Sequence, residues 1–474
     1  MTRDLTSKET MKWLVKYHET HSGLLDNNGV AIKIFEGELM PSICAAIDRQ
    51  LEPESAKIAK ERIPPFNLMK RVIDKLSKIY DHKTSRVADP DSVQGNEMIE
   101  WYMHSFGGIR SFNAANEYFN MFKYCLWQPV VYKGRPRLRA LANDRYLPWS
   151  EDNTDPSDPD GILILLGKSK DMTGKEVQEY LAYNDYQVVK FNSELELIPI
   201  ADNLENINPL GRLPFVYTIR SEDKIIPTQD TDMVQMTVTM PVIAADLNYA
   251  ILFQAFSVIY GIDIDDQDIK WGPRHFLRFK SDESRETKPE IGTIKPQIDI
   301  TETKDWIMAQ ISLWLSTRGI SPGTIGNGGS DNFASGLSKM IDEMDTSEDR
   351  NKQVGYFQHA EADLWDLVPR MHEIWRDAGM ISQTKWPTGV YVTTNFAEQV
   401  PQVRRGEVID VIDKEMKLGL LDRRSAKKRL DPHMTSLEID DFLLKVDIEK
   451  KELAEAFAPP AAIPEKDEDG ETKA

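Results

Sequence analysis

Acidic side chains crowd into one short stretch of the chain. It holds Asp263, Asp265, Asp266 and Asp268. Carboxylates that stand this close can share divalent cations, as they do in two-metal nucleases. The stretch is also rich in turn residues and leads into the basic segment Lys270–Lys280, which favours an exposed acidic rim. An acidic intracellular metal-dependent hydrolase or nuclease that uses this cluster therefore stays as the alternative hypothesis.

Three other motifs imitate catalytic or metal sites and fail on spacing. Gly161–Ser169 resembles a phosphate-binding loop, but five residues instead of four separate its glycines, and this apolar run predicts a strand. His18 and His21 are one residue too close for a zinc-protease helix, which favours solvated side chains. The loop Asp155–Gly161 has calcium-loop spacing, but Pro156 occupies the first ligand position. We therefore expect no enzyme, no metal and no cofactor.

Length and composition indicate an ordinary globular protein. The 474 residues suggest about three structural units. The two cysteines, Cys44 and Cys125, lie far apart in apolar surroundings, which is typical of reduced thiols inside a cell. The longest uncharged run, Leu247–Ile262, is shorter than the roughly 20 residues of a membrane span. We expect a soluble chain without a signal peptide or a membrane anchor.

The charge balance limits how the protein can meet nucleic acid. With 58 basic and 77 acidic side chains, the net charge is −19. Broad, tight binding to DNA needs cations that neutralise phosphates. An acidic chain is therefore suited to contact with DNA in which the DNA must not stay tightly bound.

Periodicity predicts an α+β fold that is mainly helical. Residues 1–125 carry helical patterns, whereas residues 126–220 alternate as an antiparallel β unit. The hairpin signal Lys133-Gly134-Arg135-Pro136 and the strand pattern of Leu195–Ala201 fall in that β unit.

Two helices are expected to flank a small β insert. The first covers Gln229–Tyr260 and the second Glu302–Thr317, where Trp306, Ile307, Ile311 and Leu315 share one face. Strand-like pieces between them are Phe276–Phe279 and Ile291–Ile294. Apolar side chains cover more than one face of the first helix, so they would be wet in a single copy.

A glycine-dense stretch follows the second helix and precedes a much longer one. That helix runs from about Asn332 to Leu367, and Pro369 is expected to kink or interrupt it before Gly379 ends its continuation. A strand and a helical C-terminal region complete the chain, and its last residues have a disordered composition.

Four segments, in order, resemble the portal, or head-to-tail connector, proteins of tailed bacteriophages. They are NLMKRVIDKLSKIY (67–80), NPLGRLPFV (208–216), NFASGLSKMIDEMDTSEDRNKQVGYF (332–357) and the helical run GEVIDVIDKEMKLGLLDRRSAKKRLDPHMTSLEIDDFLLKVDIEKKE (406–452). The resemblance covers most of the chain, from about Asn67 to Glu455.

This resemblance implies a portal-type fold and a dodecameric ring at one capsid vertex. The implied regions are residues 1–228 and 333–402 for the wing, 229–260 for the first stem helix, 261–300 for the clip, 301–318 for the second stem helix, 319–332 for the tunnel loop, 403–457 for the crown and 458–474 for a disordered tail.

Three groups of residues take roles from the resemblance. The tunnel loop lining the DNA channel would be Pro322, Gly323, Thr324, Ile325, Gly326, Asn327, Gly328, Gly329, Ser330 and Asp331. The clip contacts to motor, adaptor or DNA would be Lys270, Trp271, Arg274, His275, Arg278 and Lys280. Stem packing between copies would use Leu247, Ile251, Phe256, Trp306 and Trp314.

The resemblance also implies partners and a place. Double-stranded DNA would be packaged and ejected through the channel, and the ring would meet terminase, the major capsid or scaffolding protein and a head-tail adaptor. The protein would assemble in the host cytoplasm and reside in the virion, away from membranes. The function expected is a structural conduit without catalysis.

Overall fold

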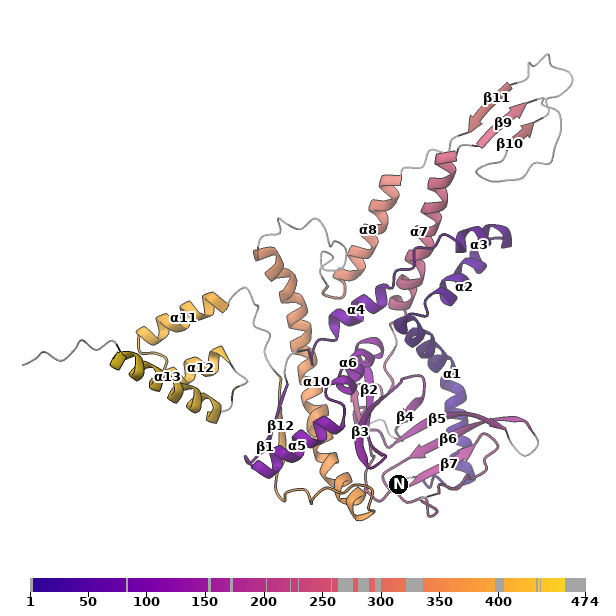
Figure 1. The fold of residues 1–474 in the computed structure, drawn as a ribbon. Coiled ribbons are helices and arrows are strands. Elements are labelled where there is room, and N and C mark those ends of the chain that lie inside the picture. Colours follow the sequence, from indigo (N-terminus) through magenta and orange to yellow (C-terminus); the bar gives the residue numbers. More distant parts are fainter. Residues whose placement is uncertain are drawn as a thin grey trace, which may run out of the picture. The chain divides into compact units, whose positions relative to one another are not determined.

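The computed structural model describes residues 3–81, 84–151, 155–170, 174–201, 203–221, 223–228, 230–256, 258–262, 276–279, 290–294, 300–320, 336–396, 405–431, 434 and 436–456. They form a mixed α/β protein in which helices are the larger part (Figure 1). The chain divides into two compact units, residues 1–396 and 397–474. Within the described ranges, no helix has both the length and the apolar character that crossing a membrane requires.

The helices have the following bounds: α1 (Lys8–Glu36), α2 (Met40–Gln50), α3 (Pro53–Lys60), α4 (Leu68–Leu76), α5 (Val93–Ser105), α6 (Arg110–Phe122), α7 (Asp232–Phe256), α8 (Ile300–Ser316), α10 (Gly336–Asp377), α11 (Arg405–Lys417), α12 (Arg423–Leu430) and α13 (Ser436–Ala456). The strands are β1 (Ser85–Asp89), β2 (Tyr124–Tyr132), β3 (Arg135–Leu141), β4 (Tyr146–Trp149), β5 (Gly161–Lys170), β6 (Glu176–Tyr183), β7 (Val188–Asn192), β8 (Val216–Ile219), β9 (Val258–Ile262), β10 (Phe276–Phe279), β11 (Glu290–Ile294) and β12 (Tyr391–Asn395).

The predicted β unit consists of two antiparallel sheets, ordered β3-β2-β8 and β4-β5-β6-β7. Lys133 and Gly134 both have positive φ, at 51° and 75°, so the β2-β3 hairpin turns in the left-handed region that glycine tolerates. The strand predicted over Leu195–Ala201 is wrong. Only isolated bridges form there, because Leu195 also has positive φ and Pro199 lacks an N–H to donate to a ladder.

Three apolar clusters fill the first unit. The first cluster joins α1, α2 and α4 to the beginning of α7 and the end of α8. The second packs α5 and α6 against α10 and β2. The third joins the start of α1 to β5, β6 and β7. The second is the most aromatic, with Trp127, Phe112 and Phe357 fully buried and in ring contact. The long helix α10 is therefore a central part of the core.

The α7–α8 pair flanks a small sheet in chain order, as predicted (Figure 1). This sheet has the order β10-β9-β11, with β9 and β10 parallel and β9 and β11 antiparallel. The helix predicted to reach Tyr260 ends at Phe256, and Val258–Ile262 is strand β9. Four of the residues in β9 are β-branched or aromatic, which favours a strand once partners are available.

The long helix α10 continues through Pro369 to Asp377. The predicted interruption at Pro369 is therefore wrong, because Leu364, Leu367 and Val368 around it are buried in the second cluster and hold the turn in place. Gly379 ends the helix as expected, with φ at 68°. Its N–H donates to Arg376 O, and the next N–H donates to Trp375 O.

The second unit contains α11, α12 and α13. Asp422 caps α12 by accepting from the backbone N–H groups of Arg424 and Ser425. Basic side chains of α12 pair with acids of the neighbouring helices: Arg423 with Asp447 at 2.8 Å, Arg424 with Asp440 at 2.9 Å and Arg429 with Glu415 at 2.6 Å. These cations hold the unit together and are not a free basic patch.

Candidate functional site

A polar cluster holds the first turn of α7 and the last turn of α8 together. Asp232, in the first turn of α7, accepts a hydrogen bond from Trp314 Nε1 at 2.9 Å and from Arg318 Nη2 at 2.6 and 2.7 Å. Partial burial acts to raise the pKa of Asp232, but the hydrogen bonds from Arg318 and Trp314 lower it overall. The carboxylate therefore stays charged, and it fixes how the two helices meet.

Beyond that cluster, α8 buries only one of its faces. Ile307, Ile311 and Leu315 pack toward the first apolar cluster at helical spacing. Trp306, predicted to share that face, is instead half exposed. The helix turns 100° per residue, so Trp306 and Ile307 cannot face the same neighbour equally.

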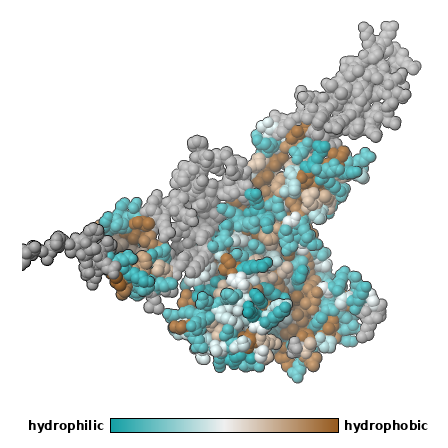
Figure 2. Space-filling view, in the orientation of Figure 1, coloured by the Kyte–Doolittle hydropathy of each residue, from teal (hydrophilic) through white to brown (hydrophobic). Residues whose placement is uncertain are grey.

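Large apolar side chains remain at the surface of this helix pair. Trp306 is 50% exposed and Leu313 65% exposed, and Met308 and Ile251 are also exposed. Figure 2 shows hydrophobic residues at the surface in this region. Among the residues predicted for stem packing, Trp314 is buried and Leu247 is partly buried within the chain itself.

Most of the other predicted site residues lie outside the described residues. These are all ten tunnel-loop positions from Pro322 to Asp331, the acidic cluster Asp263–Asp268, and Lys270, Trp271, Arg274, His275 and Lys280 of the clip. Arg278 lies on β10, opposite Gly261 of β9. Phe256 is the last residue of α7.

The first two residues of the region 319–332, which the resemblance assigns to the tunnel loop, pack against the rest of the first unit. Gly319 has φ at 65°, and a Cβ there would lie 2.9 Å from Asp349 Oδ2 of α10. Ile320 is buried, and its N–H donates to Leu315 O. The described part of α8 thus ends against α10.

Buried polar residues tie α10 to the rest of the first unit. They are Arg350, Gln353, Glu361 and His372. Arg350 donates to Ile79 O, Gln353 accepts from Asn116 of α6, Glu361 pairs with Arg86 of β1, and His372 contacts Tyr102 of α5. Each contact is specific to one position along the helix, so together they fix the register of α10.

The motifs rejected from the sequence form no site among the described residues. His18 Nδ1 lies 3.0 Å from the Tyr180 hydroxyl, so this histidine is half-buried against β6 and not solvated as predicted. Asp160 accepts from Ser150 and from the Glu151 N–H. Within the described ranges, no group of histidine, cysteine and acidic residues could hold a metal ion.

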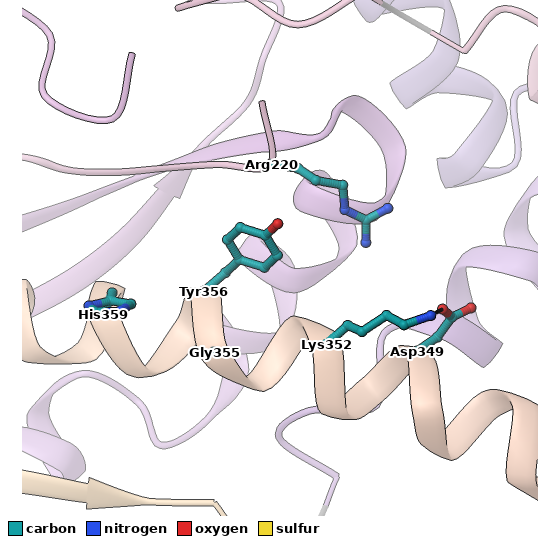
Figure 3. A pocket seen from close by; sticks show the side chains of 6 residues that line it. All are labelled: Arg220, Asp349, Lys352, Gly355, Tyr356 and His359. Atoms are coloured by element: carbon teal, nitrogen blue, oxygen red, sulfur yellow. Dashed lines mark ion pairs between the residues drawn. The ribbon is translucent and has the colours of Figure 1, made fainter. Parts of the chain in front are cut away.

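A cavity of about 540 Å³ opens beside α10, and sequence inspection missed it. Figure 3 shows its lining residues: Arg220, Asp349, Lys352, Gly355, Tyr356 and His359. Arg220 is the residue after β8, far in the sequence from the others. The available sequence signal was Gly355, a glycine inside an otherwise regular helical pattern.

Comparisons with known proteins give a loose likeness to solved structures. No protein-family model and no curated protein matches the chain. Solved structures that resemble it include a chain from the neck of an empty GTA particle computed with C6 symmetry. The two share 12% identity at a TM-score of 0.37, over 80% of this chain and 93% of that one.

Proposed function

We propose that the protein is a phage portal, a dodecameric ring at one capsid vertex through which double-stranded DNA is packaged and ejected. In this proposal the α7–α8 pair is the stem, the β9–β11 sheet belongs to the clip, and the second unit is the crown. The protein acts as a conduit without chemistry of its own. Its partners are terminase, the capsid or scaffolding protein and a tail adaptor.

One observation carries the proposal: α8 keeps large apolar side chains exposed while it is paired with α7. Trp306 and Leu313 lie on the helix faces that no other described element covers. A lone surface leucine needs no explanation, but exposed Trp, Met and Leu on one short helix are typical of an interaction surface. A neighbouring copy of the same pair is the partner that a ring supplies.

Burial against neighbours would stabilise such a ring. Apolar surface removed from water contributes about 25 cal/mol per Å², so a leucine or tryptophan side chain contributes about 2 kcal/mol. This contribution recurs at every interface around a closed ring, because each copy presents the same two surfaces. The fixed α7–α8 geometry at Asp232 lets the copies meet without reordering these helices.

The second unit adds further surface of the same kind. Leu418, Leu420 and Leu444 are strongly exposed, and Figure 2 shows hydrophobic patches on this unit. Side-by-side copies would cover them. This supports a second belt of subunit contacts in the crown.

The charge of the chain supports the role of a conduit. A net charge of −19 per copy gives a ring a strongly negative field. If many cations bound the DNA phosphates, each step of DNA movement through the ring would have to break these contacts, at a cost in free energy. An acidic channel wall instead leaves the duplex free to slide.

The experiment replaces one exposed apolar residue of α8 by an acid. Leu313→Glu puts a charge into the proposed subunit contact and should shift the full-length protein from ring to smaller species in size-exclusion chromatography with light scattering. The matched control is Val93→Glu, because Val93 is 78% exposed at the start of α5, where a glutamate suits the helix dipole.

Circular dichroism should show both variants folded. The proposal fails if Leu313→Glu leaves the particle mass unchanged, or if Val93→Glu dissociates the particle equally.

A further inference from the structure

The cavity beside α10 gathers positive charge on an acidic protein. Arg220 faces the side of α10 that carries Lys352 and Tyr356 (Figure 3). His359 lies on the same side of α10, one turn after Tyr356. Among the described lining residues, Asp349 is the one carboxylate, and its Oδ1 lies 3.6 Å from Lys352 Nζ.

Arg220 has its charge available for a ligand. Its guanidinium lies over the ring of Phe119, 5.3 Å from the ring centroid, which holds the side chain in position without neutralising it. Among the described residues, no carboxylate pairs with it. A planar guanidinium held in this way is suited to bidentate recognition of a phosphate.

Gly355 keeps the floor of the cavity open. Glycine is unfavourable inside a helix, and α10 is otherwise regular there. Packing does not require it, since an added Cβ would meet nothing within 4 Å, and its φ is not positive. Gly355 is solvent-exposed and lines the cavity, so a longer side chain at this position would take up space beside Lys352 and Tyr356.

The size and lining of the cavity indicate the class of ligand. The cavity has a volume of about 540 Å³ and opens to solvent, and Arg220, Lys352 and His359 are exposed at its surface. It would therefore hold a phosphate-bearing ligand at the surface without enclosing it. The half-buried ring of Tyr356 packs on Phe119 at 5.5 Å between centroids, which gives the site a fixed aromatic wall. In nucleotide binding, cations contact the phosphate and an aromatic side chain stacks on the base. The lining of this cavity offers both kinds of group.

We propose that this cavity binds a phosphate group carried by a nucleotide, either a free nucleotide or a nucleotide unit of DNA. Arg220 and Lys352 would hold the phosphate, and Tyr356 would contact the base. The site lies on the first unit, and its described lining residues include none of the ten predicted tunnel-loop positions and none of the predicted clip residues.

The test measures binding by isothermal titration calorimetry on the full-length protein. The probes are inorganic phosphate, dAMP and a short double-stranded oligonucleotide. Arg220→Gln removes the free cation and Gly355→Gln fills the floor, and each should weaken binding by about tenfold or more. Lys385→Gln is the matched control, because Lys385 is an exposed lysine away from the cavity. This variant should bind the probes with the same affinity as the unaltered protein.

The probes separate the two sources of phosphate. Loss of dAMP binding in Arg220→Gln and Gly355→Gln supports a free-nucleotide site, and loss of duplex binding in the same variants supports a contact with DNA. Equal affinities in all variants overturn the proposal. So does tighter binding of a glutamate-rich peptide than of any phosphate probe, since the site would then recognise an acidic protein. Unchanged circular dichroism shows that the variants are folded.

Discussion

Glu361 is a fully buried acid in the middle of α10. It pairs with Arg86, which donates from Nε at 2.8 Å, and it also accepts from Trp365 Nε1 at 3.0 Å. The Arg86 guanidinium lies over Phe112 in the aromatic core. A buried ion pair is weak evidence for net stabilisation, but removing one partner leaves the other charge unpaired in a low dielectric. This pair therefore fixes how β1 meets α10.

Replacing Glu361 by Gln should lower the free energy of unfolding by about 3 kcal/mol or more, because Arg86 stays buried without a counter-charge. Asp366→Asn is the control, because Asp366 lies on the same helix as Glu361 and forms a solvent-exposed pair with Arg212, which precedes β8. This variant should change the free energy of unfolding by about 0.5 kcal/mol. Urea unfolding followed by tryptophan fluorescence measures both. Equal effects of the two variants would contradict the role given to Glu361.

His372 is a buried histidine whose hydrogen bonds fix its tautomer. Its Nε2 lies 2.8 Å from Thr384 O, which can only accept, so Nε2 carries the proton. Its Nδ1 therefore accepts from the Tyr102 hydroxyl at 2.8 Å. Burial lowers the pKa of His372 below its ordinary value of 6.5, even though Thr384 and Glu373 act to raise it. The folded state thus contains the neutral ring.

The protein should lose stability as the pH falls below about 6.5, because the unfolded chain then takes up a proton that His372 resists in the folded state. Above that pH the contribution of His372 is fully present. His372→Gln keeps a donor for Thr384 O and does not titrate, so its melting temperature should fall less between about pH 7.5 and about pH 5.5. Parallel pH profiles for the two proteins would refute this assignment.

At the scale of elements, local pattern predicted most helices and strands. The β2-β3 hairpin, α8, β10, β11 and the end of α10 at Gly379 follow from periodicity and turn residues close in the sequence. The errors arose where distant contacts decide. Packing of Leu364 and Val368 carries α10 through Pro369, and pairing with β10 and β11 converts Val258–Ile262 from expected helix to strand.

The candidate sites were less predictable than the elements for the same reason. Asp232 binds Arg318, and Arg220 and Lys352 line one cavity, across long sequence separations that no spacing rule relates. Gly355 was visible as a break in helical pattern, but its meaning needed the cavity. For α8, the sequence shows an excess of apolar residues but not which of them are exposed. Trp306 and Ile307 are adjacent in the sequence, yet Trp306 is exposed and Ile307 is buried.

Gly355→Ala should stabilise α10 by about 1 kcal/mol, since alanine is the better helix former and the added Cβ meets no atom within 4 Å. Thermal unfolding followed by circular dichroism at 222 nm, the usual helix signal, would measure the gain. A loss of stability would show that the glycine is needed for packing, which would contradict an open cavity floor at this position.

At the scale of the whole molecule, the alternative function is a metal-dependent hydrolase that uses Asp263, Asp265, Asp266 and Asp268. If these acids are only rim charges, the double variant Asp265→Asn, Asp266→Asn should assemble as the unaltered protein does. Neither protein should cleave DNA in the presence of magnesium. Cleavage by the unaltered protein that the double variant lacks would favour the hydrolase.

The proposed function depends on a ring, in which neighbouring copies would cover the exposed apolar side chains of α8 and of the second unit. Electron microscopy of the purified full-length protein, with the particle mass measured in parallel, tests it most directly. We predict annular particles with an axial hole and a mass that is a whole multiple of 54.2 kDa. A folded particle of single-chain mass at every protein concentration, with no annular form, would contradict the account.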